Sequence, residues 1–461
     1  MVMEINRKYD GDLVRLKCAV QNYDWGRTGH ESLVARLLLR NSIDEIEESK
    51  HYAEFWMGTH ASGPSFLVDD KGIGNVSLKS WISKNPEVLG DTVVDKWGVD
   101  LPFMFKVLSV ARALSIQAHP DKELAGFLRM LKPNVYKDAN HKPEMVLALT
   151  EFEALCGFVT FEELEDVLEN VPEIKEVVGV AYAYQVLPLN EQDKGAKEMQ
   201  FLQSIFIKLM SSESEVISAV VSKLITRLNM EKKTRQLTSK ESLALKLEEQ
   251  HPSDIGVIAS FLFNHIKLKP GEALYIASNE PHAYLSGDCV ECMANSDNVV
   301  RAGLTPKNRD VKILCAMLTY KQGSPQILKG VPVNAYTTRY NPPFEEFEVE
   351  RCILNQGASV VFPPVPGPSI FLIHSGQGSM YTSASMSSSP SSLLSPSSSL
   401  SPSSSSSSAS SPSSTSSSED MVCGGDVFFA PANTEVHVST ESELHMYRAG
   451  VNHLMFSKLS T

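Results

Sequence analysis

The sequence predicts a mainly β protein with an inserted α-helical domain, and three observations support this prediction. Short apolar runs broken by Pro and Gly fill the first third of the chain, apolar residues then recur at three- and four-residue spacing, and the short runs return after Pro270-Gly271. At 461 residues the chain is too long for a single compact core, so we expect two or three domains.

The first β domain is expected in residues 1–155 and 266–330, with strands at 103–108, 144–149, 273–277 and 288–293. The helical domain is expected between its two parts, in residues 156–265. One helix there places five apolar residues at helical spacing: Ile217, Val220, Val221, Leu224 and Leu228. Pro252-Ser253-Asp254 is a start signal for another helix that carries Ile255, Ile258 and Leu262.

A second β domain is expected in residues 331–461, interrupted by a serine-rich tract at 383–418. The tract cannot bury enough apolar surface to offset its ordering entropy, so we predict a disordered insertion between two strands. Its Ser-Pro steps are candidate phosphorylation sites, and a tolerated spacer is the alternative.

A weak internal repeat relates the two β regions. In the first copy, Gly271 is followed by an acidic residue and later by Asn279. In the second copy, Gly425 is followed at the same spacing by Asp426 and Asn433. The first copy has His282 at the position where the second has Val436, with a histidine one place later. A one-residue slip turns a strand side chain to the other face, so we expect the second β domain to carry no metal.

Composition excludes several classes of protein. No apolar run reaches the roughly 20 residues that cross a bilayer, and residues 1–15 lack the apolar core of a signal peptide, so we expect a cytosolic protein without a membrane partner. A net charge of −13 argues against nucleic acid as a partner. Seven sparse cysteines indicate thiols, and the isolated CxxC of Cys289 and Cys292 is weak support for a redox or zinc motif.

Four polar residues could form a metal site. Gln117 and His119 share a strand face because they are two residues apart, Glu144 opens an apolar strand, and His282 follows a proline turn. Each one alone is better explained as an ordinary polar residue. Together, two imidazoles, a carboxylate and an amide oxygen suit zinc and leave room for water or a substrate oxygen.

The sequence resembles the type I mannose-6-phosphate isomerases (phosphomannose isomerases) over nearly the whole chain outside the serine tract, and its tail is closer to plant than to fungal members. The resemblance rests on five segments: Gln21-Asn22-Tyr23-Asp24-Trp25-Gly26, Ala53-Glu54-Phe55-Trp56-Met57-Gly58-Thr59-His60, Ser115-Ile116-Gln117-Ala118-His119-Pro120, His141-Lys142-Pro143-Glu144 and residues 275–311. It implies two cupin-like jelly-roll barrels and one zinc ion bound by Gln117, His119, Glu144 and His282. It also implies the interconversion of mannose 6-phosphate and fructose 6-phosphate, which supplies mannose for GDP-mannose.

Isomerisation requires ring opening, proton transfer from C2 to C1 through an enediol, and a positive partner for the transient oxyanion. Arg301 is always charged and can hold the phosphate or the enediolate, and the matching arginine of the family is regarded as catalytic. By the same resemblance, Ser115, Lys106, Arg301 and Lys307 bind the phosphate. Lys106 is the better supported of the two lysines as a phosphate contact, because a cation among apolar residues is costly to bury without an anion.

The general base remains open among several residues. Glu291 alternates with apolar residues on a strand, Asp297 lies in a polar loop before Arg301, and a salt bridge to Arg301 is the alternative role for either. A buried carboxylate has a raised pKa, which suits a base. His141 and Lys142 are further candidates, for ring opening.

Two other functions are weighed against the isomerase. A cupin-type oxygenase or epimerase would need iron ligation, which Gln117 in place of a third histidine disfavours. A catalytically inactive binding protein would have lost a ligand or Arg301, and this chain retains all five residues. We expect a monomer that acts on a small sugar phosphate.

Overall fold

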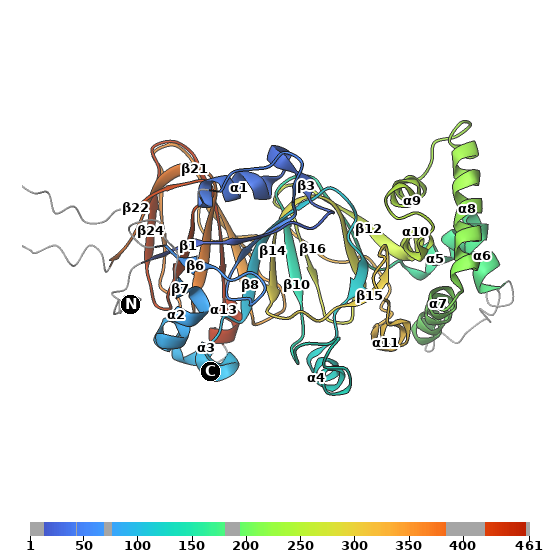
Figure 1. Cartoon of the computed structure of the whole chain (residues 1–461), viewed down its shortest axis with the longest axis horizontal. Coiled ribbons are helices and arrows are strands. Elements are labelled where there is room, and N and C mark those ends of the chain that lie inside the picture. The colour runs from blue at the N-terminus through green and yellow to red at the C-terminus, as the bar shows by residue number, and fades with distance from the viewer. Residues whose placement is uncertain (1–12, 43, 69–75, 180–193, 384–419, 458–461) are drawn as a thin grey trace, which may run out of the picture.

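The computed structural model describes residues 13–42, 44–68, 76–179, 194–383 and 420–457. Two large antiparallel sheets lie side by side along its long axis, and a group of helices lies at one end, next to the first sheet (Figure 1). The predicted mainly β fold with a helical insertion is therefore confirmed. The cupin-like jelly-roll form of each β domain stays a prediction.

The first sheet has eleven strands in the described part of the chain, and it contains Gln117, Glu144 and His282, while His119 directly follows its strand β9. Its strands are β2 (Ala19–Gln21), β5 (Glu54–Met57), β8 (Phe103–Val110), β9 (Ile116–Ala118), β10 (Glu144–Ala148), β11 (Phe152–Phe158), β12 (Phe263–Leu268), β13 (Ala273–Ile276), β14 (His282–Ala294), β15 (Val300–Gly303) and β16 (Ile327–Leu328). The central strands β8 and β10 are buried on both faces, which matches their largely apolar sequences.

The second sheet has twelve strands among the described residues and contains most of the C-terminal region. Its strands are β1 (Val14–Lys17), β6 (Phe66–Leu67), β7 (Val76–Ser77), β17 (Val331–Pro332), β18 (Thr337–Tyr340), β19 (Glu348–Leu354), β20 (Ser359–Phe362), β21 (Ser369–Thr382), β22 (Asp420–Cys423), β23 (Val427–Ala430), β24 (Val436–Ser439) and β25 (Leu444–Gly450). Three short N-terminal strands, β1, β6 and β7, thus extend the C-terminal sheet, because β1 pairs with β23.

The serine-rich tract predicted at 383–418 lies outside the described residues apart from Ser383. The strands on its two sides, β21 and β22, pair with each other, with Gln377 opposite Cys423 and Met380 opposite Asp420. The tract therefore connects two neighbouring strands of one sheet.

The helical insertion lies between β11 and β12. Its helices are α5 (Phe161–Asn170), α6 (Pro172–Val178), α7 (Lys194–Met210), α8 (Ser214–Glu231), α9 (Ser239–Gln250) and α10 (Ile255–Ala259). The five apolar residues predicted to share a helix face are all buried in α8. Asp254 accepts a hydrogen bond from the backbone N–H of Gly256 and so caps α10, as the start signal predicts.

Shorter helices cover the sheets and connect them. They are α1 (Leu33–Asn41), α2 (Leu78–Lys84), α3 (Asp91–Trp97), α4 (Lys122–Leu131), α11 (Val311–Met317) and α13 (His453–Ser457). Of these, α4 directly follows the predicted ligand His119 and protrudes from the first sheet in Figure 1.

The predicted internal repeat has matching backbone geometry in its two copies. Gly271 and Gly425 have φ values of 87° and 99°, and Asn279 and Asn433 have φ values of 65° and 61°. These left-handed conformations favour Gly and Asn, which explains why both residue types recur at one spacing. In the second copy Val436 is buried at 1% exposure, whereas the His437 side chain is 27% exposed and pairs with Glu435.

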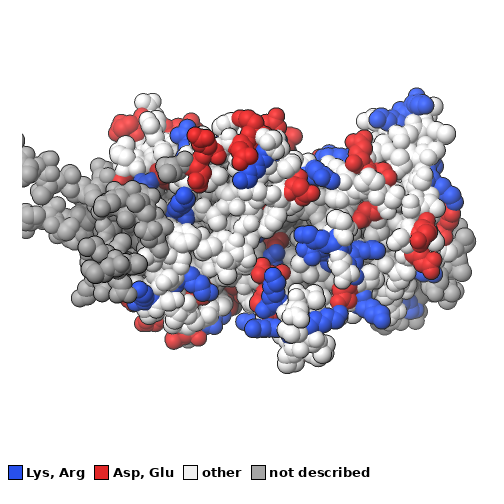
Figure 2. Space-filling model, viewed as in Figure 1, with Lys and Arg blue, Asp and Glu red and all other residues white. Residues whose placement is uncertain are grey.

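No helix in the described ranges combines the length and the apolar character that crossing a bilayer requires. Both signs of charge are spread over the face shown in Figure 2, and basic side chains gather around α4. The net charge of −13 therefore does not prevent a local concentration of positive charge.

Candidate functional site

Three of the four predicted metal ligands converge at one buried position, from the residue after β9 and from the first residues of β10 and β14. One ligand atom from each of His119, Glu144 and His282 lies within 4.8 Å of the others, and all three residues are buried. The Nε2 atom of His119 lies 3.3 Å from Oε1 of Glu144, and the Nε2 atom of His282 lies 3.3 Å from Oε2. Two imidazoles thus face one carboxylate.

Both histidines are held by the ring nitrogen that points away from this centre. The Nδ1 atom of His119 lies 2.6 Å from the backbone oxygen of Asn298, and the Nδ1 atom of His282 lies 3.2 Å from that of Glu280. A carbonyl oxygen can only accept a hydrogen bond, so each Nδ1 carries the proton and each Nε2 keeps a free lone pair. Among the described residues neither Nε2 atom has a hydrogen-bond partner.

Glu144 is fixed by two further groups. The Lys142 ammonium lies 2.8 Å from its Oε1, and the Tyr284 hydroxyl donates to its Oε2 at 3.0 Å. Burial acts to raise the pKa of Glu144, but Lys142 and His119 outweigh it and hold that pKa well below its usual range. Burial and the Lys142 charge lower the pKa of His119 to about 4. At neutral pH the site therefore presents a carboxylate and a neutral imidazole, the forms that bind metals.

Gln117 and Arg301 join the same face through strand pairing. Gln117 of β9 is directly opposite His282 of β14 on one side and opposite Arg301 of β15 on the other. Opposite residues of an antiparallel pair project to the same face with their Cβ atoms about 5 Å apart. The sheet thus brings the fourth predicted ligand next to a histidine ligand and the predicted catalytic arginine next to the candidate metal site.

A β-bulge interrupts β14 between His282 and Glu291. In its pairing with β11, Glu153 is opposite Ser286 but Ala154 is opposite Tyr284, so β14 has one extra residue. The next residue, Gly287, has a φ of 113°, and a Cβ there would lie 2.4 Å from a backbone oxygen. Only glycine fits this bend.

The bulge lets one strand supply two groups of the site. His282 and Glu291 are an odd number of residues apart, so simple alternation would turn them to opposite faces. Tyr284, which shares the face of His282, nevertheless packs in one cluster with Cys289, which shares the face of Glu291. Both functional residues therefore face the same interior.

Lys106 lies in a buried cluster of charges beside the predicted metal ligands. Its ammonium is 3.0 Å from Glu291 and 3.2 Å from Glu54, and it lies 5.1 Å from the ring centre of Trp56. Burial would lower the pKa of Lys106, but the two carboxylates raise it, so the lysine stays charged. Burial raises the pKa of Glu291 despite Lys106. Two carboxylates share one cation here, so the anion that the burial of Lys106 requires comes from the protein itself.

Arg301 is a half-buried cation whose charge is not balanced by a described carboxylate. Within the described ranges it forms no ion pair and no side-chain hydrogen bond, and burial lowers its pKa. Neither Glu291 nor Asp297 therefore forms the salt bridge to Arg301 that was the alternative role for them. Of the other predicted phosphate contacts, Ser115 is half-buried directly before β9, and Lys307 is exposed.

The remaining candidates for proton transfer differ in their surroundings. Asp297 is exposed, and its hydrogen bond with His60, at 3.2 Å, lowers its pKa, which makes it a weaker base than Glu291. The Nε2 atom of His141 lies 2.7 Å from Glu346. A carboxylate in this position orients an imidazole.

Several residues of the site were missed from sequence. Glu54 and Trp56 alternate within a segment that carried the family resemblance, so strand periodicity could have placed them on one face. Glu346 and the backbone oxygen of Asn298 had no sequence signal, because their role depends on distant segments meeting in the fold.

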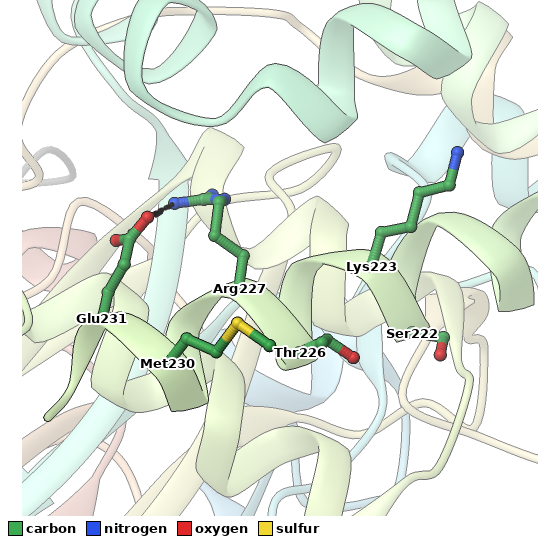
Figure 3. Close-up of a pocket in the computed structure, with 6 residues that line it drawn as sticks. All are labelled: Ser222, Lys223, Thr226, Arg227, Met230 and Glu231. Atoms are coloured by element: carbon green, nitrogen blue, oxygen red, sulfur yellow. Dashed lines mark hydrogen bonds and ion pairs between the residues drawn. The ribbon is translucent and has the colours of Figure 1, made fainter.

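A second concave region lies far from these residues. It is lined by Ser222, Lys223, Thr226, Arg227, Met230 and Glu231, all from α8 (Figure 3). Its cations are already paired, Lys223 with Glu176 and Arg227 with Glu231 and Glu173. One helix face with neutralised charges does not enclose a ligand.

Comparison with known proteins identifies relatives over most of the chain. The model of the type I phosphomannose isomerase catalytic domain matches residues 13–161, and that of the type I helical insertion domain matches residues 178–263. Mannose-6-phosphate isomerase 1 of Arabidopsis thaliana is 53% identical over 440 residues, which cover 95% of this chain and 94% of the relative. The human mannose-6-phosphate isomerase is 44% identical over 343 residues, which cover 73% of this chain and 81% of the relative.

Solved structures agree with this match. A mutant of phosphomannose isomerase from Salmonella typhimurium has a TM-score of 0.75 at 26% identity, covering 96% of this chain and all of that one. A mannose 6-phosphate isomerase bound with zinc and yttrium has a TM-score of 0.74 at 26% identity, covering 95% of this chain and 99% of that one.

Proposed function

The chain belongs to the type I phosphomannose isomerase family and is an isomerase, and we propose that it interconverts mannose 6-phosphate and fructose 6-phosphate with one bound zinc ion per chain. Gln117, His119, Glu144 and His282 would be the ligands. The observation that carries the proposal is the pair of buried Nε2 atoms without partners on either side of the Glu144 carboxylate. Buried polar atoms without partners are costly, so a cation fits there.

The donor set favours zinc among the common metals. Two imidazole nitrogens and a carboxylate are its frequent catalytic ligands, and the Gln117 amide oxygen adds a neutral fourth donor. Zinc, when bound, supplies a Lewis acid that polarises a substrate oxygen and lowers the cost of negative charge on it.

Proton transfer is assigned to residues around this centre. As general base, Glu291 would take the proton from C2 of the open-chain aldose and return it to C1. The C1 aldehyde oxygen gains a proton to become a hydroxyl, and the C2 hydroxyl loses its proton to become the ketone. The raised pKa of Glu291 suits this base better than the lowered pKa of Asp297. The C2–C1 enediolate would be stabilised by Arg301, whose charge is unpaired within the described ranges.

Ring opening and phosphate binding complete the proposal. His141, oriented by Glu346, would move the proton between the C1 hydroxyl and the ring oxygen, with Lys142 as the alternative. Ser115 and Lys307 would bind the phosphate, and Arg301 would bind it in the alternative in which it does not hold the enediolate. Lys106 belongs to this set by resemblance, although its charge is balanced by two carboxylates. We further propose that the enzyme is a cytosolic monomer that supplies mannose for GDP-mannose and glycan synthesis.

The proposal is tested by measuring fructose 6-phosphate formation from mannose 6-phosphate with and without a chelator. Chelation should abolish the conversion and added zinc should restore it. His282→Ala should lower activity by more than the 10- to 100-fold typical of changes around metal ligands. The matched control is His437→Ala, which removes the partly exposed histidine of the second repeat and should change neither activity nor zinc content. Full activity in the metal-free protein would contradict the metal assignment.

A further inference from the structure

The loop between β14 and β15 is bound tightly to the segment that leads into β10. The side chain of Asp138 accepts hydrogen bonds from four groups of these two segments: the backbone N–H of Asn140 at 2.9 Å, the Ser296 hydroxyl at 2.8 Å, the Asn298 amide at 3.1 Å and the backbone N–H of Asp297 at 2.8 Å. One carboxylate thus joins residues that are about 160 positions apart in the sequence.

Asn298 continues this network into the metal site. Its amide nitrogen also donates to the backbone oxygens of Asp138 at 2.9 Å and Asn140 at 3.0 Å, and the residue is 1% exposed. Its own backbone oxygen accepts the hydrogen bond from Nδ1 of His119 at 2.6 Å. The group that orients a metal ligand is therefore held in place by the network around Asp138.

The two connected segments carry the other functional groups. His141, Lys142 and Glu144 follow Asp138 directly, and Arg301 follows Asn298 at the start of β15. A shift of either segment would move the Glu144 carboxylate relative to the His119 ring. A displacement of 1 Å in a catalytic arrangement can cost about 100-fold in rate.

We propose that Asp138, Asn140, Ser296 and Asn298, the Asp138 clasp, form a positioning unit that holds His119 in the tautomer and orientation that binds zinc. The clasp touches neither metal nor substrate and acts through the Asn298 carbonyl. This inference rests on the proposed zinc-dependent function. Groups that orient metal-bound histidines in this way commonly contribute 10- to 100-fold to metal affinity or activity.

Asp138→Asn tests the clasp with almost no change in side-chain volume. Asparagine has a single acceptor oxygen, so if that oxygen keeps the three donors now on Oδ1, its NH2 group must face the backbone N–H of Asp297. The variant therefore loses one hydrogen bond and places two donors against each other. The matched control is Asp95→Asn, an exposed aspartate on α3.

The measurement is the zinc dissociation constant of the full chain, from competition with a chromophoric chelator, together with kcat at saturating zinc and the melting temperature. We expect Asp138→Asn to weaken zinc binding 10- to 100-fold and to lower kcat, while Asp95→Asn matches the wild type. Ser296→Ala removes one donor of the clasp and should weaken zinc binding by a smaller factor. If Asp138→Asn does not fold, the zinc affinity of Ser296→Ala tests the proposal in its place.

Zinc affinity within about twofold of the wild type in both clasp variants would overturn the proposal, even if their melting temperature falls, because the network would then serve stability alone. A wild-type chain that isomerises mannose 6-phosphate without needing zinc would overturn the proposed function as well. The two failures are therefore distinguishable.

Discussion

Replacing Lys106 with Met should destabilise the first sheet by about 3–5 kcal/mol at neutral pH, the usual cost of removing one partner from a buried ion pair. Met fills a similar volume, so the loss comes from charge and not from a cavity. Glu54 and Glu291, whose side chains are 10% and 4% exposed, would remain 3.0 to 3.2 Å from the vacated ammonium position without a counterion. Two uncompensated carboxylates would then share one buried site.

The pH dependence of this loss gives a sharper test. Burial already raises the pKa of Glu291, and removing Lys106 should raise it further. A carboxyl with a folded pKa above its unfolded value binds more protons when folded, so its folded state loses stability as pH rises through that range. The destabilisation by Lys106→Met should therefore be largest near neutral pH and smaller in mild acid, where the carboxyls take up protons.

The assay is urea unfolding of wild type and variant, followed by tryptophan fluorescence at several pH values. Lys79→Met is the matched control, because Lys79 pairs with Asp100 at 2.7 Å but is 52% exposed, and its loss should cost at most about 1 kcal/mol. A loss below about 1 kcal/mol for Lys106→Met, or an equal loss at every pH, would refute the idea that Lys106 balances two buried carboxylates.

Two further predictions concern turnover and the serine tract. Arg301→Ala should lower kcat strongly, because it removes the unpaired cation assigned to the enediolate. The zinc content, measured by atomic absorption, should stay at one ion per chain. Loss of zinc as well would show that Arg301 has a structural role. Replacing residues 384–418 with a four-residue Gly-Ser linker, which keeps Ser383 and its hydrogen bond to Glu435 at 2.5 Å, should leave kcat/KM unchanged. Loop-closure entropy predicts a gain in stability of up to about 2 kcal/mol. A folded but inactive deletion would show that the tract does more than connect β21 and β22.

Local sequence patterns predicted much of the architecture. The helix face of α8, the cap at Asp254 and the strands β8 and β10 were all predicted from periodicity or capping, which depend on neighbours within a few residues. The internal repeat also had a local cause, since left-handed backbone at Gly271 and Asn279 restricts which residues can occupy those positions.

The charge state of the site depended on the fold instead. The sequence suggested that Lys106 needs an anion, and the resemblance pointed to phosphate. Pairing of β5, β8 and β14 placed Glu54 and Glu291 beside it. Which strands become neighbours is decided by packing of the whole sheet, so the identity of the counterion could not be read from residues near Lys106.

Residue pattern alone predicted the groups of the candidate metal site and, through strand alternation, a common face for Gln117 and His119. How these groups meet depends on contacts between distant segments. The extra residue in β14 turns His282 and Glu291 to one face, and the distant Asn298 carbonyl selects the nitrogen that His119 presents. Alternation and capping act along the chain, whereas register, bulges and hydrogen bonds between segments arise only when distant strands pack together.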